Sequence, residues 1–481
     1  MKRIFIIGWS VDDGLGLVEV AKELQKQSHK IVYWTWAGTG IGKIADSKEF
    51  SGVIWHSHED AVAGLPAKEI NTSNFFPPGE DLIAKLYEAE SAVLSMMNKK
   101  YKDIGVSERK QIYFDLVRYW YGVIQTLKPD VVIHNDIPHT VYDFIIFSIC
   151  ELLNIKNIIF ERIVQFDRML LMNDYRIGSR SLEKALQDNR GRKFVLADLR
   201  EDMRRHYQEQ LSDMVPRNIQ KLKKNYIGKK AIFTKIKMIR DSLVNLTFFG
   251  KTFNFISKIF RENLKTEYES VALPADFTKP FIYVPLNYQP ERTSSPQGGV
   301  FVNQILMIEI LAASVPSDWL IYVKEHPSQW LPRGLNFFNC RYRGFYKSIA
   351  RLPNVRLVPM ATGTHELIRN CQVLATVSGT AGWEALMRAK PVLVFGFPWY
   401  KECSGVFKVN NVESCKDAIW RIRQGFGVSP ELMFNYLAAL DQSSVQAYFD
   451  LVGKELSGIS KEENIKNLSR LILSELETAP S

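Results

Sequence analysis

Several features that define other classes of protein are missing from this sequence. The chain has only five cysteines in 481 residues and no Cys-x-x-Cys pair, which excludes a disulfide framework and a cysteine zinc site. No Asp-x-Asp tripeptide occurs, and the eight histidines include no His-x-x-x-His or Glu-x-x-His pair. A metal ion is therefore not expected in the functional site.

Long apolar runs are missing as well. The apolar stretch near the N-terminus ends at Gly8, which is too short for a signal peptide, and the apolar stretch 144–153 is too short to cross a bilayer. Together with cysteines that fit a reducing compartment, these absences predict a cytoplasmic location.

What the sequence does contain is a strongly basic tract. Thirteen Lys and Arg residues lie between Arg217 and Lys265 against two acidic residues, so the rest of the chain is nearly neutral although the net charge is +10. The apolar residues of the tract recur at helical spacing, and it has no nucleic-acid-binding motif. The tract predicts peripheral contact with the anionic inner-membrane surface and no nucleic acid, the alternative being a packed helical hairpin.

Apolar strand patterns alternate with helical patterns in two parts of the chain. This alternation, and a length that exceeds one ordinary core, predict an α/β fold with two Rossmann-like parallel sheets. The expected segments are an N-terminal Rossmann-like domain at 1–179, a basic helical insertion or connector at 180–277, a C-terminal Rossmann-like domain at 278–428, and C-terminal helices without further strands at 429–481.

The first functional motif follows an apolar strand at 319–324. Lys324, Glu325, His326 and Pro327 place a cation, an acid and an imidazole at the end of that strand, and the proline stops the strand and fixes the direction of the loop. This is a natural place for a phosphate contact, although a histidine that only satisfies backbone groups is the alternative.

The second motif connects an apolar strand to an apolar helix. Ser378, Gly379 and Thr380 bring two hydroxyls and free N–H groups to a helix N-terminus, where an anion is favoured, although a plain N-cap is the alternative. Glu384, one turn into the helix, is placed to bridge the hydroxyls of a ribose. Arg292, after the first strand of the second domain, could neutralise a phosphate or a sugar carboxylate.

Two polar clusters in the N-terminal half could supply a catalytic base. Asp12 and Asp13 follow the first strand, where paired carboxylates raise one another's pKa. His134, Asp136 and His139 follow a later strand and bring two imidazoles and a carboxylate to the same edge of the sheet. The residues alone do not choose between the two clusters.

Three segments together resemble bacterial capsule polysaccharide biosynthesis proteins, a family that includes the Kdo transferases of capsule assembly. They are 284–291, 322–327 and 375–384, the last followed by Lys390-Pro391. The resemblance implies the GT-B glycosyltransferase architecture of two facing Rossmann-like domains. It also implies that the first domain binds the acceptor, that the second binds the nucleotide sugar, and that the last helices pack back on the first domain.

Sialyltransferases of the same architecture use an acidic pair before glycine as the base, and a His-Pro motif and a Ser/Thr pair for the phosphate of CMP. Asp12-Asp13-Gly14, His326-Pro327 and Ser378/Thr380 resemble these three motifs. Here the acidic pair follows the first strand instead of a later one, and Gly379 separates the two hydroxyls.

These observations predict a metal-independent glycosyltransferase of bacterial surface polysaccharide synthesis, for capsule or O-antigen. It would need no cofactor and would transfer a sugar, Kdo or another nonulosonic acid on a CMP carrier, from a nucleotide-sugar donor to a glycan or lipid-linked saccharide acceptor. The alternatives are a polyol-phosphate transferase that uses a CDP donor, a sugar-nucleotide epimerase, and a non-catalytic scaffold for capsule assembly.

Overall fold

The computed structural model describes residues 1–101, 104–163, 165–212, 263–330 and 340–478. Contacts between residues divide the chain into two compact units. The first comprises 1–194, 295–299 and 435–481, and the second comprises 195–294 and 300–434. Most of the basic tract lies outside the described residues, so its predicted contact with a membrane stays a prediction.

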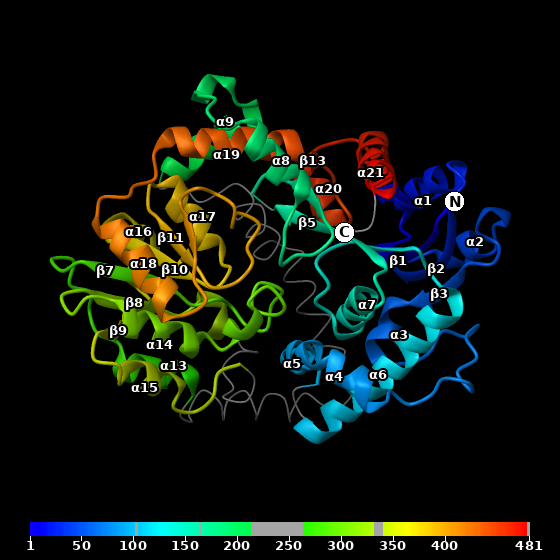
Figure 1. The fold of residues 1–481 in the computed structure, drawn as a ribbon, viewed down its shortest axis with the longest axis horizontal. Coiled ribbons are helices and arrows are strands. Elements are labelled where there is room, and N and C mark those ends of the chain that lie inside the picture. The colour runs from blue at the N-terminus through cyan, green and yellow to red at the C-terminus, as the bar shows by residue number, and fades with distance from the viewer. Residues whose placement is uncertain (102–103, 164, 213–262, 331–339, 479–481) are drawn as a thin grey trace, which may run out of the picture. The chain divides into compact units, whose positions relative to one another are not determined.

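The first unit is built on a seven-stranded sheet in the order β13-β6-β5-β4-β1-β2-β3 (Figure 1). Its strands are β1 (Arg3–Ser10), β2 (Lys30–Ala37), β3 (Ile54–Ser57), β4 (Val131–His134), β5 (Lys156–Ile163), β6 (Arg168–Met172) and β13 (Val445–Gln446). The five strands from β3 to β5 are parallel, whereas β6 and β13 are added antiparallel.

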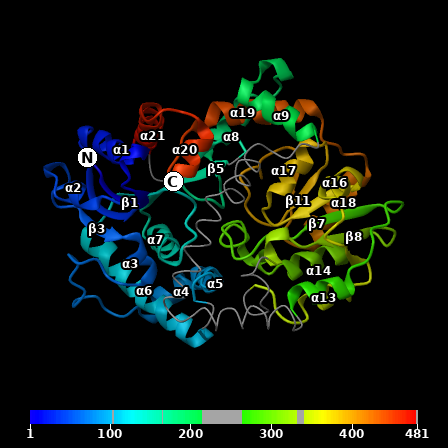
Figure 2. The same ribbon diagram turned by 180° about the vertical axis from the view of Figure 1, so that it is seen from behind.

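Helices cover both faces of this sheet, as expected where strands alternate with helices. They are α1 (Leu17–Lys26), α2 (Ile41–Ala45), α3 (His58–Ala63), α4 (Glu80–Lys85), α5 (Tyr87–Met96), α6 (Val106–Leu127), α7 (Val141–Leu152), α8 (Arg180–Asp188), α20 (Leu451–Ser457) and α21 (Lys461–Leu476). Helix α21 lies beside α1 although the two are far apart in the sequence (Figures 1 and 2). Their contact adds Leu468 and Ile472 to the core that contains Leu17 and Val20.

One expectation about the C-terminal segment is wrong. Residues 429–481 were expected to contain helices alone, but Val445–Gln446 forms β13 and pairs with β6. A strand of two residues is too short to show the alternation of apolar and polar side chains that reveals a strand in a sequence.

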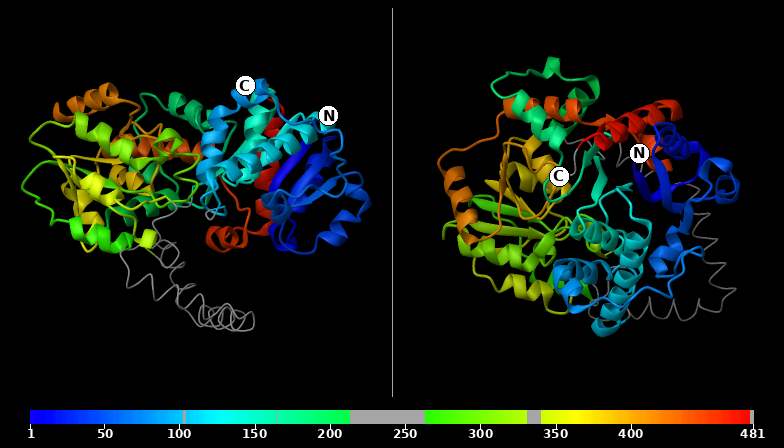
Figure 3. Two further views of the ribbon diagram at one scale, coloured as in Figure 1. Left: turned by 90° about the horizontal axis from the view of Figure 1, so that it is seen from below. Right: turned by 45° about the vertical axis from the view of Figure 1, so that its right-hand side comes forward.

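The second unit is built on a six-stranded parallel sheet in the order β12-β11-β10-β7-β8-β9, which can be followed in green and yellow in Figure 3. Its strands are β7 (Phe281–Pro285), β8 (Leu320–Lys324), β9 (Val355–Leu357), β10 (Val373–Thr376), β11 (Val392–Val394) and β12 (Val406–Lys408). Its helices are α9 (Glu201–Leu211), α13 (Leu264–Val271), α14 (Gln304–Ser314), α15 (Phe345–Ala350), α16 (Thr364–Asn370), α17 (Thr380–Met387) and α18 (Val412–Arg423). Helix α19 (Pro430–Ser443) contains the boundary between the two units.

The core of the second unit follows from its sequence pattern. Strands β7, β8 and β10 are buried almost throughout, as strands of a parallel sheet covered on both faces must be. Polar side chains gather where these strands end, and the functional motifs lie there.

Candidate functional site

The loops that follow β7 and β10 meet at the switch point of the second sheet. Strand β7 lies between β10 and β8, so the chain leaves β7 on one side and later returns on the other as β10. Open α/β sheets bind ligands at such a point, outside the carboxyl ends of the strands. Asn287 joins the two loops, because its Oδ1 accepts a hydrogen bond from Thr376 Oγ1 at 3.1 Å and its Nδ2 lies 3.5 Å from Ser378 Oγ.

Helix α17 follows β10, with Gly379 as its N-cap and Thr380 as its first residue. The N–H of Gly379 donates to Thr376 Oγ1 at 3.1 Å, and Tyr400 Oη donates to the Gly379 carbonyl. Thr380 is exposed, and its hydroxyl forms no hydrogen bond with the residues that the structure describes. The first N–H groups of a helix lack partners within the helix and lie at the positive end of its dipole, so this position favours an anion.

Ser378 lies differently from Thr380, although the sequence assigns both to one phosphate. Its side chain is buried, and its hydroxyl donates to the carbonyl of Thr293 in the loop after β7. A hydroxyl has one proton, so in this arrangement Ser378 can meet a ligand only as an acceptor. The assignment of Ser378 to the phosphate stays a prediction, and the geometry favours Thr380 as the donor.

His326 follows β8, the neighbour of β7, at the same edge of the sheet. Its Nδ1 accepts a hydrogen bond from the N–H of Ser328 at 3.1 Å, which assigns the proton of the neutral ring to Nε2. Burial lowers the pKa of His326, so the ring is neutral near pH 7. No described residue bonds to Nε2, and this atom is not enclosed, so His326 offers a free N–H donor.

The two residues before His326 face the interior. Lys324 Nζ donates to the carbonyl of Thr362 and lies 3.2 Å from Thr364 Oγ1. Glu325 is buried beside Arg341, whose Nε donates to Glu325 Oε2 at 2.8 Å. Their assignment to the nucleotide stays a prediction, and the geometry gives both residues a supporting role.

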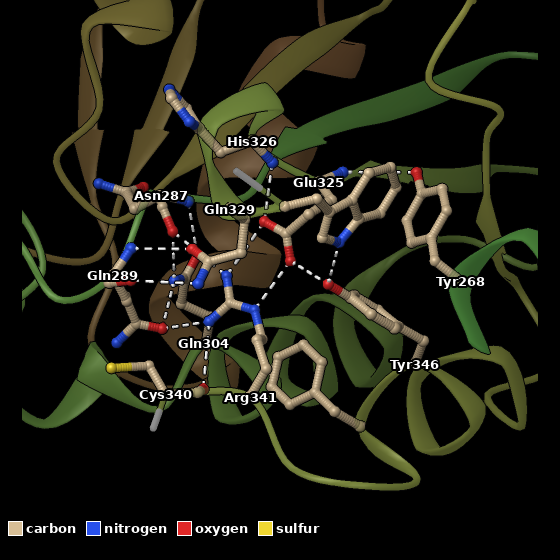
Figure 4. A network of polar contacts seen from close by, with 12 residues as sticks. Tyr268, Asn287, Gln289, Gln304, Glu325, His326, Gln329, Cys340, Arg341 and Tyr346 are labelled. Carbon is tan, nitrogen blue, oxygen red and sulfur yellow. Dashed lines mark hydrogen bonds and ion pairs between the residues drawn. The ribbon is translucent and has the colours of Figure 1, made fainter. Parts of the chain in front are cut away.

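Glu325 and Arg341 are the centre of a larger polar network (Figure 4). Tyr346 Oη donates to Glu325 Oε2 at 2.6 Å, and Arg341 also donates to Gln289 and to the carbonyl of Asn287. The network therefore connects the loop after β7 to the loop after β8. Pro327 begins the short 3-10 helix Pro327–Trp330, whose Gln329 donates to the Gln289 carbonyl at 3.1 Å and closes the same network.

Glu384 and Arg292 are the remaining residues that the sequence predicts for this site. Glu384 is half-buried on α17, and burial raises its pKa while the charge of Arg388 opposes the shift. No described residue donates a hydrogen bond to its carboxylate, which leaves that group available to a ligand. Arg292 is half-buried in the loop after β7, next to the Thr293 carbonyl that holds Ser378.

In the first unit the switch point lies between β1 and β4, and the two predicted base clusters flank it. Asp12 accepts hydrogen bonds from Ser10 Oγ and from the N–H of Thr39, both at 2.9 Å. The Thr39 hydrogen bond lowers the pKa of Asp12, and a Cβ at Gly38, where φ is +92°, would lie 2.6 Å from the carboxylate. Asp12 therefore holds the loop after β2, and a carboxylate stabilised as the anion is a weak base.

Asp13 makes different contacts from Asp12. Its side chain is 97% exposed and pairs with Lys461 of α21 at 3.0 Å. Lys461 also pairs with Glu19 at 2.7 Å. The structure thus does not place the two carboxylates together as a pair that shares one proton.

The histidine cluster is also divided. His134 is buried at the end of β4 and its Nε2 lies 3.2 Å from Asn157 Oδ1, and burial lowers its pKa to about 4. Asp136 Oδ1 accepts the N–H of Ile137 at 2.8 Å. His139 is half-buried, and its Nδ1 donates to the Ile137 carbonyl at 2.8 Å, which assigns the lone pair to Nε2. No described residue bonds to this Nε2 and it is not enclosed, so it can accept a proton.

Three residues of these sites are absent from the residues predicted from the sequence. Asn287 and Arg341 connect the loops at the edge of the second sheet, and His58 at the start of α3 contacts Tyr142, three residues after His139. Asn287 belongs to one of the segments that carry the family resemblance, which was the signal available for it. Arg341 and His58 stand in no recognisable motif.

Among the described residues, no group of three or more His, Cys, Asp or Glu side chains is arranged to hold a metal ion. Within the same residues, no helix is both long and apolar enough to cross a membrane.

Comparison with known proteins bears mainly on the second unit. Residues 292–424 match the model of the family described as capsule polysaccharide biosynthesis protein. The matched segment contains Arg292, His326, Ser378, Thr380 and Glu384, and it excludes both predicted base clusters. No curated protein sequence matches the chain.

Solved structures match at low identity. They include a beta-Kdo 2,7-transferase, KpsC, from Thermosulfurimonas dismutans, at 13% identity over 73% of this chain and 88% of that chain with a TM-score of 0.29. UDP-GlcNAc 2-epimerase from Neisseria meningitidis matches at 12% over 99% of each chain with a TM-score of 0.25. Glycosyltransferase SnogD from Streptomyces nogalater matches at 12% over 98% of this chain and 99% of that chain with a TM-score of 0.21. At these TM-scores the matches carry no argument about activity.

The fold defines the class of the protein: an α/β chain with two Rossmann-like sheets, the pair of domains that makes up the GT-B architecture. Within this class, the resemblance to capsule polysaccharide biosynthesis proteins is confirmed over residues 292–424.

Proposed function

We propose that the protein is a metal-independent glycosyltransferase of bacterial surface polysaccharide synthesis, for capsule or O-antigen. The observation that carries the proposal is the pair of free donors at one edge of the second sheet: Nε2–H of His326, and the N-terminus of α17 with the Thr380 hydroxyl. Both lie in the segment that matches the capsule family. Such donors stabilise a departing phosphate electrostatically, without proton transfer.

The second unit would bind the nucleotide part of the donor sugar. His326 and Thr380 would hold the phosphate, and the free carboxylate of Glu384 would accept the ribose hydroxyls. Because Arg341 and Asn287 connect the loops that carry these groups, the donors are fixed before the ligand arrives.

The first unit would bind the acceptor saccharide, a glycan or a lipid-linked sugar. His139 is the base that the geometry favours, since its Nε2 carries a free lone pair whereas Asp12 is engaged and Asp13 is paired with Lys461. In the reaction, Nε2 takes the proton of an acceptor hydroxyl, and the acceptor oxygen bonds to the anomeric carbon. The bond from that carbon to the phosphate oxygen breaks, and the nucleotide leaves with the electron pair.

The donor sugar proposed is Kdo or another nonulosonic acid on CMP. The support is the resemblance of His326-Pro327 and of Ser378/Thr380 to the CMP-binding motifs of sialyltransferases. Thermal shift of the purified chain with CMP, CDP, UDP and GDP tests the carrier, and selective stabilisation by CMP is expected. Selective stabilisation by another nucleotide would contradict this choice without affecting the reaction class.

The His326 variants test the donor site. His326→Ala should weaken nucleotide binding about 10- to 100-fold, because one hydrogen bond to a charged group is lost. His326→Gln retains an N–H donor and should recover part of the affinity. His365→Ala is the control, an imidazole on α16 of the same unit. Unchanged sugar transfer and unchanged nucleotide affinity in His326→Ala would sink the proposal.

Product analysis separates the rival functions. A polyol-phosphate transferase with a CDP donor leaves the phosphate in its product, and a sugar-nucleotide epimerase turns over its substrate without an acceptor. A scaffold turns over no nucleotide sugar. The glycosyltransferase proposal expects an acceptor-dependent product that lacks the phosphate.

We further propose a cytoplasmic protein that associates peripherally with the inner membrane through residues 217–265. The support is the excess of basic residues in this tract, because each Lys or Arg near an anionic surface contributes about 1 kcal/mol. Replacing Lys221, Lys223, Lys224, Lys229 and Lys230 together by Gln should reduce binding to anionic liposomes. Binding that stays unchanged would remove the membrane claim.

A further inference from the structure

A second imidazole lies near the proposed base on the first unit. His58 begins α3 directly after β3, and His139 lies in the loop between β4 and α7. Both strands belong to the parallel part of the sheet, so both residues lie at its carboxyl edge. Helices α3 and α7 are in contact, which brings the two loops together although two strands separate β3 from β4 in the sheet.

The His58 ring is held by the first turn of α7. Its Nδ1 lies 2.8 Å from Tyr142 Oη, and the two rings meet edge to face with centroids 5.5 Å apart. Tyr142 Oη also donates to Thr35 Oγ1 at 3.3 Å, and Thr35 in turn accepts the N–H of Gly8 at 2.7 Å. The orientation of His58 is therefore held by Tyr142 of α7 and Thr35 of β2, both of which are buried.

The other nitrogen of each ring is available. No described residue bonds to Nε2 of His58 or of His139, and neither atom is enclosed. His58 contacts Tyr142, which follows His139 by three residues, so the two imidazoles lie at the same end of α7. Burial lowers the pKa of His58, and the charge of His139 lowers it further. Nδ1 of each ring donates, in His58 to Tyr142 Oη and in His139 to the Ile137 carbonyl, so Nε2 of each ring can accept one hydrogen bond.

The surroundings indicate which ligand suits this pair. Glu59 and Asp60 follow His58 on α3, while Lys100 opposes them, so the charges near the pair are mixed. Mixed charge does not favour a strongly anionic group. Two ring nitrogens that each accept a hydrogen bond suit uncharged hydroxyl groups, such as neighbouring hydroxyls of a sugar ring.

We propose that His58 and His139 form a paired-imidazole subsite for the acceptor sugar, in which Nε2 of His58 hydrogen-bonds the hydroxyl next to the one that His139 deprotonates. The subsite rests on the proposed glycosyltransferase function, and it makes His58 a residue that determines acceptor binding and has no part in donor binding. Tyr142 then acts as a positioning residue for His58.

Steady-state kinetics test whether His58 contributes to acceptor binding and not to donor binding. His58→Ala should raise the KM for the acceptor about tenfold, the value expected for one lost hydrogen bond, and should leave the KM for the donor and the nucleotide affinity unchanged. His58→Gln, which keeps a hydrogen-bonding group, should recover part of the loss. Tyr142→Phe should raise the acceptor KM less than His58→Ala. His29→Ala, a half-buried histidine at the opposite end of β2, should change neither constant.

A second measurement does not depend on catalysis. In protein labelled with [13Cε1]histidine, the resonances of His58 and His139 are assigned from His58→Gln and His139→Gln, and methyl glycosides of glucose, galactose and N-acetylglucosamine are titrated in. Joint shifts of the two resonances support the subsite. If none of the glycosides shifts either resonance, or if His58→Ala keeps the wild-type acceptor KM, the subsite is wrong.

The two measurements also distinguish a failure of the subsite from a failure of the proposed glycosyltransferase function. If the wild-type chain transfers no sugar from any nucleotide sugar while the glycosides shift both resonances, the subsite stands and the proposed reaction fails. Transfer that is normal in all His58 variants overturns the subsite and leaves the glycosyltransferase proposal intact.

Discussion

Arg341 and Glu325 form an ion pair with no exposed side-chain surface, with 2.8 Å between Nε of Arg341 and Oε2 of Glu325. Oε1 of the same carboxylate accepts the N–H of His326 at 2.7 Å. The pair therefore holds the backbone that carries the free Nε2–H donor. Burial of two charges costs free energy, which only the full set of hydrogen bonds around them offsets.

Removing one partner of this pair should destabilise the second unit strongly. Arg341→Met leaves the Glu325 carboxylate buried without a counter-charge, so we expect a loss of about 3–5 kcal/mol in the free energy of unfolding, measured by urea denaturation. Arg351→Met, an exposed arginine at the end of α15, is the control and should change it by less than about 0.5 kcal/mol. Equal losses in the two variants would show that the pair adds nothing beyond surface charge.

Gly382 is close-packed against Tyr400 within α17. A Cβ at Gly382 would lie 2.2 Å from Tyr400 Oη, the group that donates to the Gly379 carbonyl at the helix start. Alanine normally stabilises a helix relative to glycine by about 1 kcal/mol, but here Gly382→Ala should destabilise by about 1–3 kcal/mol in thermal or urea unfolding.

A double variant shows whether the hydroxyl is the cause. Tyr400→Phe removes the atom that the new Cβ meets, so Gly382→Ala should cost less in the Tyr400→Phe background than in the wild type. A cost that is the same in both backgrounds would place the strain elsewhere, for example at Thr376, whose Cγ2 would lie 3.2 Å from the Cβ.

The sequence was a good guide to the strands and to the sheet edges that carry the motifs. The strand expected at 319–324 is β8, Leu320–Lys324, because a buried parallel strand is a continuous apolar run bounded by polar loops. The same rule located the loops of His326 and Thr380, since loops after parallel strands lie at one edge of the sheet.

What the sequence could not show is the direction of each side chain within those loops. Lys324, Glu325 and His326 are consecutive, yet only His326 offers a free group, because the contacts of the other two depend on Arg341 and Thr362, which are distant in sequence. The approach of His58 to His139 likewise depends on the packing of α3 on α7. No local pattern reports such contacts.

His134 should make stability depend on pH. Burial lowers its pKa from 6.5 to about 4, so the unfolded chain binds a proton at this residue between those pH values and the folded chain does not. The wild type should therefore lose about 3 kcal/mol of stability at this residue as the pH falls from 7 to 4. Urea unfolding of wild type and His134→Asn at both pH values measures this difference. Parallel losses in the two proteins would mean that another group is responsible.

Glu384 gives a test of nucleotide orientation. If its carboxylate accepts the ribose hydroxyls, the wild type should bind 2′-deoxy-CMP about tenfold more weakly than CMP, as one lost hydrogen bond predicts. Glu384→Gln should bind both nucleotides about equally, because the amide loses the charge that strengthens this contact. Glu366→Gln, an exposed acid on α16, should keep the wild-type preference.

Since burial raises the pKa of Glu384, the preference for CMP should also decline in mildly acidic solution, above pH 4.5, as the carboxylate is protonated. Calorimetric titration of both nucleotides at two pH values measures all of these effects. A preference for CMP that persists in Glu384→Gln would place the ribose elsewhere and leave His326 and Thr380 as the only support for the nucleotide site.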